Sequence, residues 1–251
     1  YPRINRALRA EGTKRANPER SQGFEAQRSA GARRYRATVQ RVNWITPTIR
    51  DITLQLPQDG TWDAGQYALV RVAPFEWRPY SIASAPRKAV RLLVDVRTQG
   101  HGAAWARHTQ SGDEVDLELP YGHFLHDTAA GGTHADTPSP CRRVFVATGT
   151  GIAPFLAEFE RGIRADDVLL LGLATTSDDL TTRLDAPLPH VIRCVSREKT
   201  PETFHGRVTD YLRTTGIDPQ VDYYACGSPL MVTDVAHLIR AAGGYVHTES
   251  F

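Results

Sequence analysis

The stretch VFVATGTGIAPF, from Val144 to Phe155, joins an apolar run to a helix-period segment through two closely spaced glycines. Glycine permits the tight backbone conformations of such a turn, and the amides at a helix N-terminus can bind an anion. Pro154 suits the first helical turn, where its missing N–H costs nothing. The stretch therefore predicts a strand, a phosphate-binding loop and a helix. It departs from the dinucleotide fingerprint G-x-G-x-x-G, because Pro154 stands at the third glycine position.

The chain continues in the same rhythm around and beyond this stretch. Apolar runs alternate with helix-period segments; the runs span 142–148, 168–174, 190–195, 221–227 and 245–251, and the segments span 149–163, 177–184, 207–215 and 229–243. This alternation is typical of βα units around a parallel sheet. We therefore expect an α/β domain in the second half of the chain.

The first half has a different rhythm, with short strand-like runs separated by turn signals. These runs span 34–42, 48–56, 66–72, 78–84, 90–97 and 113–119, and one helical segment interrupts them at 100–110. Strands at this spacing indicate a closed antiparallel barrel or a sandwich. A stretch rich in Gly, Thr, Pro and Ala at 127–141 reads as a linker loop between the halves.

Composition favours a globular protein and excludes several classes of site. The 251 residues are 41% hydrophobic and 23% charged, and no apolar run approaches the roughly 18 residues of a membrane-spanning helix. The N-terminus is polar and lacks the apolar segment of a secretory signal, so we expect a cytoplasmic protein. The cysteines Cys141, Cys194 and Cys226 lie far apart, which excludes a disulfide framework and a four-cysteine metal site within this chain.

Charge is unevenly distributed along the chain. Residues 1–34 carry a net charge of +6, and the remaining residues carry −4. Because the basic segment has few aromatic residues and little apolar periodicity, we expect a flexible, solvated extension. A docking arm for an acidic partner stays open as an alternative. We expect no nucleic-acid partner.

Two further stretches carry more polar groups than the fold alone needs. The strand RPYSIAS, 78–84, gathers a guanidinium, an aromatic ring and two hydroxyls. The stretch CGSP, Cys226 to Pro229, follows the fourth apolar run of the α/β half, at a strand end where open parallel sheets bind ligands. Free cysteines are mostly buried structural thiols, so Cys226 alone leaves both interpretations open.

Taken together, RPYS, GTGIAPF and CGSP resemble, in this order and spacing, the ferredoxin–NADP reductase superfamily. The resemblance covers residues 35–251. It implies an FAD-binding antiparallel β-barrel at 35–126, a linker loop at 127–141 and an NAD(P)-binding α/β parallel-sheet domain at 142–251, preceded by the extension at 1–34.

The resemblance also implies roles for residues of the barrel. Arg78 would pair with the FAD pyrophosphate, a bidentate task for a planar guanidinium, with Pro79 beside it. Tyr80 would pack on the flavin ring or its ribityl chain, and Ser81 would lie near flavin N5. Amides of a glycine-rich helix start would face the pyrophosphate, and these belong to Gly100, Gly102, Ala103 and Ala104. Ala103 replaces the family's usual hydroxyl.

In the second domain the resemblance assigns residues to the nicotinamide nucleotide. Its pyrophosphate would be lined by Gly149, Thr150, Gly151 and Pro154. The nicotinamide would be bordered by Cys226, Gly227, Ser228 and Pro229. Glu249 and the terminal Phe251 match the family's acidic and aromatic C-terminus, and Phe251 would cover the flavin face. Fraying of the chain end is the alternative for both.

The resemblance favours NADPH over NADH without excluding NADH. Ser196 and Arg197 follow the third apolar run of the α/β half, where NADP-specific members have Ser-Arg on the 2′-phosphate. A solvated loop is the alternative for this pair. His123 and His126 have no partner ligands nearby in sequence, so we expect no metal site.

These inferences predict an FAD-dependent NAD(P)H oxidoreductase with Ser81, Cys226, Glu249 and Phe251 at the reaction site. Electrons would leave for an external one-electron carrier such as ferredoxin, flavodoxin or an oxygenase component, and we expect a monomer. Two alternatives stay open. One is a flavin reductase that uses free flavin as a substrate, and the other is a regulatory flavin- or nucleotide-binding module without turnover.

Overall fold

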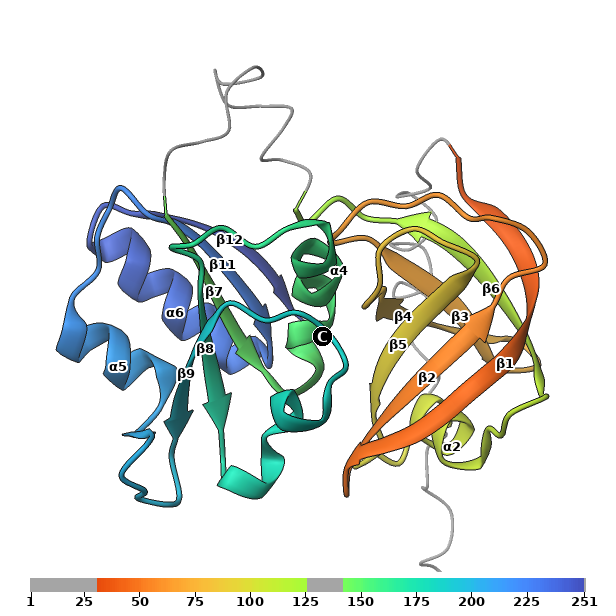
Figure 1. Cartoon of the computed structure of the whole chain (residues 1–251), viewed down its shortest axis with the longest axis horizontal. Helices are drawn as coiled ribbons and strands as arrows, with labels where there is room; N and C mark the ends of the chain where they lie inside the picture. The colour runs from red at the N-terminus through yellow and green to blue at the C-terminus, as the bar shows by residue number, and fades with distance from the viewer. Residues whose placement is uncertain (1–30, 126–141, 251) are drawn as a thin grey trace, which may run out of the picture.

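The computed structural model describes residues 31–125 and 142–250 (Figure 1). The predicted linker at 127–141, nearly all of the predicted extension at 1–34, and the residues Cys141, His126 and Phe251 lie outside the described residues. The described parts form a curled antiparallel sheet followed by a parallel sheet with helices on both faces. The predicted order of the two architectures is confirmed.

The first sheet has six strands, and each was expected from the sequence. They are β1 (Arg33–Thr46), β2 (Ile49–Gln55), β3 (Tyr67–Ala73), β4 (Glu76–Ser81), β5 (Ala89–Asp95) and β6 (Glu114–Tyr121), in the order β4-β3-β6-β1-β2-β5. The edge strands β4 and β5 meet where Ile82 bridges Leu92 and the Ala83 amide donates to the Arg91 carbonyl at 2.8 Å. The sheet therefore curls until its edges meet, which confirms the predicted barrel.

Alternating side chains place one face of β1 inside this barrel. Tyr35, Ala37 and Val39 are buried, and the residues between them are exposed. The strand begins at Arg33, two residues inside the predicted extension, because Arg33 and Arg34 pair with the end of β6. The Arg34 guanidinium is also bonded to the Glu118 carboxylate. Both arginines are exposed, as their charge predicted, and Arg34 lies on the face of β1 opposite to Tyr35.

The predicted helix near residue 100 is α2 (His101–His108), which lies at one end of the barrel (Figure 1). Its C-terminus is held by Arg50 of β2, whose Nη1 donates to the Arg107 carbonyl at 3.0 Å, to the Thr109 carbonyl at 3.1 Å and to the Ala106 carbonyl. A cation at a helix C-terminus satisfies unpaired carbonyls and complements the helix dipole. Arg50 therefore fixes α2 against the barrel wall.

The second sheet is wholly parallel. Its strands are β7 (Arg143–Thr148), β8 (Val168–Leu173), β9 (His190–Val195), β10 (Phe204–His205), β11 (Asp222–Gly227) and β12 (Tyr245–Ser250), in the order β10-β9-β8-β7-β11-β12. The 3₁₀ turn η1 (Gly149–Ile152) and helix α4 (Ala153–Arg161) follow β7 on the barrel side, and α5 (Val208–Thr215) and α6 (Pro229–Ala241) cover the opposite face (Figure 1). None of the helices in the described ranges is long and apolar enough to cross a membrane.

One helix-period segment of the sequence is not an α-helix. Residues 177–184 form parts of two 3₁₀ turns, η2 (Thr176–Asp178) and η3 (Leu180–Arg183). The Asp179 carboxylate accepts from the Thr181 amide at 2.9 Å and from Arg193 Nε at 2.5 Å. Side chains that form hydrogen bonds to nearby backbone groups compete with helix formation. This competition explains why residues 177–184 form 3₁₀ turns and not the predicted α-helix. The two-residue strand β10 was not predicted either, since it is too short to show alternation.

The barrel and the α/β half share an apolar core. Ile45, Ile49 and Leu93 of the barrel belong to one buried cluster with Phe155 and Phe159 of α4. Polar contacts cross the same boundary: the Glu160 carboxylate accepts from the Ala85 amide at 2.8 Å, and Arg183 Nη1 donates to the Ile45 carbonyl at 2.9 Å. The orientation of the two halves, and of the site between them, is thus set by packing.

Candidate functional site

A cavity of about 580 Å³ lies where β4, α2 and η1 approach one another. Its lining includes most of the residues predicted for the flavin, namely Arg78, Pro79, Tyr80, Ser81, Gly100, Gly102 and Ala103. Thr150 and Ser250 reach it from the α/β half. The structure therefore gathers residues from both halves of the sequence in one cavity. Thr150, which was predicted to line the nucleotide pyrophosphate, is among the residues that line this cavity.

The start of α2 approaches β4 so closely that only glycine fits at position 102. A Cβ on Gly102 would overlap the Tyr80 hydroxyl and would lie 3.6 Å from Arg78 Cγ. The Ala104 amide donates to the Gly100 carbonyl at 3.0 Å, and Ala104 is not among the residues that line the cavity. The glycine thus brings a helix N-terminus beside a guanidinium, which is a suitable environment for a phosphate.

The polar groups of the RPYSIAS strand have different partners. Arg78 Nε donates to Glu76 Oε1 at 2.7 Å, and the other Glu76 oxygen lies 2.5 Å from His101 Nδ1. Burial raises the pKa of Tyr80 to about 12, so its phenol keeps its proton at neutral pH. Ser84 lies outside the cavity: its Oγ donates to the Ala89 carbonyl and accepts from the Arg91 amide, each at 3.2 Å, and so closes the turn before β5.

Ser81, Glu249 and Cys226 meet at the junction of the two sheets. Ser81 Oγ donates to Glu249 Oε2 across this junction at 3.4 Å. Burial raises the pKa of Glu249 to about 7, and the Ser81 hydrogen bond opposes part of that shift. Cys226 faces Glu249 in the β11–β12 register and is fully buried, and burial together with the Glu249 charge raises the pKa of its thiol. Cys226 is therefore a neutral thiol, unsuited to act as a nucleophile.

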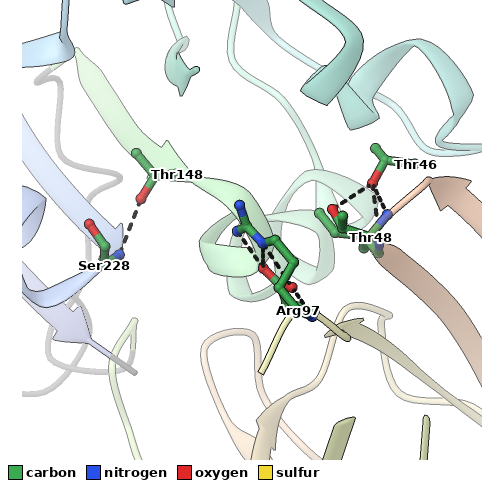
Figure 2. A network of polar contacts seen from close by, with 7 residues as sticks. Thr46, Thr48, Arg97, Thr148 and Ser228 are labelled. Atoms are coloured by element: carbon green, nitrogen blue, oxygen red, sulfur yellow. Dashed lines mark hydrogen bonds and ion pairs between the residues drawn. The ribbon is translucent and has the colours of Figure 1, made fainter. Parts of the chain in front are cut away.

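A second cavity, of about 370 Å³, lies between the barrel and the carboxyl ends of the parallel strands. Thr46, Thr48 and Arg97 line it from the barrel, and Thr148 and Ser228 face them from the α/β half (Figure 2). The polar residues on each side of this cavity form hydrogen bonds with neighbours on the same side. Thr46 Oγ1 accepts from the Ile49 amide at 3.0 Å, Arg97 Nε donates to Asp95 Oδ2 at 2.9 Å, and the Ser228 amide donates to Thr148 Oγ1 at 3.1 Å (Figure 2).

Residues predicted for the nucleotide divide into those that line this cavity and those that support it. Gly149, Ser196, Arg197 and Ser228 line it. Gly151 and Pro154 are buried beneath the loop, and a Cβ on Gly151 would overlap the Cys226 carbonyl and lie 2.6 Å from Gly227 Cα. Gly227 has φ +140, and a Cβ there would lie 2.9 Å from the Thr148 carbonyl oxygen. Pro229 begins α6, which Ser228 caps by accepting from the Met231 amide. These glycines are required for close packing of the loop.

Comparison with known proteins agrees with this arrangement. The oxidoreductase NAD-binding domain family matches residues 145–237. Reductase component 2 of terephthalate 1,2-dioxygenase from Comamonas sp is 28% identical over 222 residues, which cover 81% of this chain and 63% of that protein. The chain thus spans less than two thirds of the length of this curated relative.

Two solved structures share the fold. A ferredoxin NADP⁺ reductase from Neisseria gonorrhoeae with bound FAD and NADP superposes with a TM-score of 0.70 at 20% identity, covering 88% of this chain and 99% of that one. The Amycolatopsis cytochrome P450 reductase GcoB superposes with a TM-score of 0.73 at 24% identity, covering 89% and 71%. These matches support the predicted resemblance to the ferredoxin–NADP reductase superfamily. They agree with the predicted class, a flavoprotein oxidoreductase of the FAD- and NAD(P)-binding type.

The cavity between barrel and helix suits the flavin of this superfamily. Its lining presents the Arg78 cation and the N-terminus of α2, which are groups suited to phosphates, together with the Ser81 hydroxyl. Gly102 supplies the close approach that this arrangement requires. Among the described residues, no group of three His, Cys, Asp or Glu side chains could hold a metal ion.

Sequence reasoning missed two arginines that line the second cavity. Arg207, the residue that precedes α5, lines the same cavity as Ser196 and Arg197, and Arg97 reaches the cavity from the barrel. A signal for Arg207 was present, since it follows Gly206 at a helix start in the α/β half. Arg97 had no such signal, because the cavity that it lines exists only once the two halves pack together.

Proposed function

We propose that this chain takes hydride from NADPH onto FAD and passes the electrons singly to an external protein. One observation carries the proposal: the adjacent residues Gly149 and Thr150 line different cavities, Gly149 the nucleotide cavity and Thr150 the flavin cavity. Ligands in the two cavities would therefore approach each other across a single turn, beside Ser81, Glu249 and Cys226. That proximity is what direct hydride transfer requires.

The chain's own residues would bind and orient the two ring systems. FAD, when bound, supplies a hydride acceptor that can release two electrons one at a time. Arg78 and the amides at the start of α2 would hold its pyrophosphate, and Ser81 would donate a hydrogen bond near the reacting edge of the ring. Cys226, a buried neutral thiol, would fix the depth of the nicotinamide without bonding to it.

The nucleotide cavity supports NADPH as the hydride donor. Ser196, Arg197 and Arg207 all line it, and Ser196 Oγ is anchored by donating to the Leu173 carbonyl at 3.3 Å. Two guanidinium groups and a hydroxyl suit a 2′-phosphate, which forms charge-assisted hydrogen bonds. NADH lacks that phosphate and would leave both cations unpaired.

The support for a protein acceptor is the role named for the relatives. The Comamonas relative is the reductase component of a dioxygenase, and the Amycolatopsis structure is a cytochrome P450 reductase. An oxygenase component is therefore the acceptor that we favour, with ferredoxin or flavodoxin as the other carriers to test.

The proposal is tested by anaerobic stopped-flow spectroscopy on the purified, FAD-loaded chain. NADPH should bleach the flavin absorbance faster than NADH, and an added one-electron carrier protein should restore it. Absence of bleaching with either nucleotide would instead indicate a regulatory binding module. If the flavin is lost on gel filtration yet free FAD is reduced in turnover, the chain is a flavin reductase.

A further inference from the structure

We propose that Glu76 is a positioning residue for the flavin pyrophosphate, acting through Arg78 and His101. The proposal rests on the FAD binding proposed above and adds two residues to it. Glu76 uses both carboxylate oxygens. Oε1 accepts from Arg78 Nε at 2.7 Å and pairs with Nη2 at 2.5 Å, and Oε2 lies 2.5 Å from His101 Nδ1.

The two partners of Glu76 belong to the two elements that form the phosphate end of the cavity. Arg78 lies on β4, and His101 is the first residue of α2. One carboxylate therefore joins the guanidinium to the helix N-terminus. Gly102, which packs against Tyr80 and Arg78, keeps the strand and the helix at the same close distance.

The hydrogen bonds of Arg78 leave one edge of its guanidinium for a ligand. Nε and Nη2 are engaged by Glu76, whereas Nη1 has no hydrogen-bond partner within residues 31–125 and 142–250. Arg78 is also among the residues that line the cavity. Because Glu76 already holds Nε and Nη2, the Arg78 side chain loses less conformational entropy when it binds a phosphate.

The same arrangement recurs at the nucleotide cavity, which argues against a chance surface pair. Asp95 stands two residues before Arg97, as Glu76 stands two residues before Arg78; Glu76 and Arg78 share a face of β4, whereas Asp95 ends β5 and Arg97 follows it. Arg97 Nη2 pairs with Asp95 Oδ2 at 2.5 Å, and Arg97 lines that cavity. Each cavity thus has one arginine on the barrel side that a carboxylate two residues earlier holds in place.

The test measures flavin affinity, with no turnover required. Apoprotein would be titrated with FAD, FMN and riboflavin, following flavin fluorescence, for the wild-type chain and for Glu76→Gln. Because riboflavin has no phosphate, it reports on the ring site alone. The matched control is Glu114→Gln, which removes a similar carboxylate from an exposed ion pair with Arg36 on the same barrel.

We expect Glu76→Gln to raise the dissociation constants of FAD and FMN about fivefold to tenfold, the effect of weakening one charged hydrogen bond. Riboflavin affinity should change less than about twofold, and the control should leave all three unchanged. His101→Gln should follow the same pattern with a smaller effect, since Arg78 keeps its carboxylate.

Three results would overturn the positioning role. These are an equal loss of affinity for riboflavin, which would mean general damage to the barrel; unchanged affinities for all three flavins; and tighter binding of FAD, which would mean that Glu76 repels the phosphate. Failure of wild-type apoprotein to bind FAD at all would instead contradict the proposed function, so the two failures are distinguishable.

Discussion

Replacement of Glu249 by Gln should make the chain more stable at alkaline pH and leave its stability unchanged at acid pH. Burial between the two sheets raises the pKa of this carboxyl from 4.5 to about 7. The folded chain therefore holds a proton that the unfolded chain releases. A neutral Gln has no charge to bury, so the variant avoids the cost of ionising Glu249 in the folded state.

The size of the effect follows from the difference between the two pKa values. A difference of about 2.5 units, at 1.36 kcal/mol for each, amounts to about 3 kcal/mol. Because the folded pKa is the higher one, the favourable contribution is complete below about pH 4.5 and is lost as pH rises through about 7. The variant should match the wild type near pH 4.5 and exceed it by about 3 kcal/mol at pH 8.5.

The assay is urea unfolding of the wild type and of Glu249→Gln across this pH range, followed by circular dichroism. The control is Glu114→Gln, which removes an exposed carboxylate from the same barrel. A difference between Glu249→Gln and the wild type that stays constant with pH would refute the reasoning. It would mean that Glu249 ionises in the folded chain as it does in water, through an opening of the junction beside Ser81.

Three further substitutions test the nucleotide side of the site. Arg197→Ala should weaken NADPH binding by roughly 1.5–3 kcal/mol, the value of a hydrogen bond to a charged group, and leave NADH binding nearly unchanged in equilibrium titrations; equal losses would contradict the 2′-phosphate assignment. Cys226→Ser should slow flavin reduction, by up to about a hundredfold if the ring shifts by 1 Å, without changing nucleotide affinity; a covalent nucleotide adduct on Cys226 would overturn its positioning role. Gly151→Ala should cost about 1–3 kcal/mol of unfolding free energy by overpacking against the Cys226 carbonyl. Gly100→Ala, whose Cβ would meet nothing within 4 Å, is its control, and similar losses would mean that the loop can shift.

The sequence predicted the two architectures because both rest on local periodicity. Alternation along β1 and the apolar runs of the parallel strands are visible in single segments, as is the glycine turn after Thr148. The residues Arg78, Tyr80 and Ser81 could be found because they stand together in one strand. Local sequence patterns could not show which distant residue each of these side chains contacts.

The features that were missed depend on contacts between distant segments. Glu76 and His101 are 25 residues apart and meet only because α2 folds back onto β4. Arg97 lines the nucleotide cavity only after the barrel docks on the α/β half. Residues 177–184 were misread for a related reason, since Asp179 is held by Arg193 from a neighbouring strand and by its own turn rather than by a helix.

The apolar cluster shared by the two halves determines how the protein can be dissected and fused. The cluster includes Leu93 and Ile49 on one side and Phe155 and Phe159 on the other, so producing the halves separately would expose part of its apolar surface to water. Each isolated half would then carry an exposed apolar patch and tend to aggregate. Protein engineers who wish to attach this chain to another domain should therefore join at its ends and keep the two halves together as one cassette.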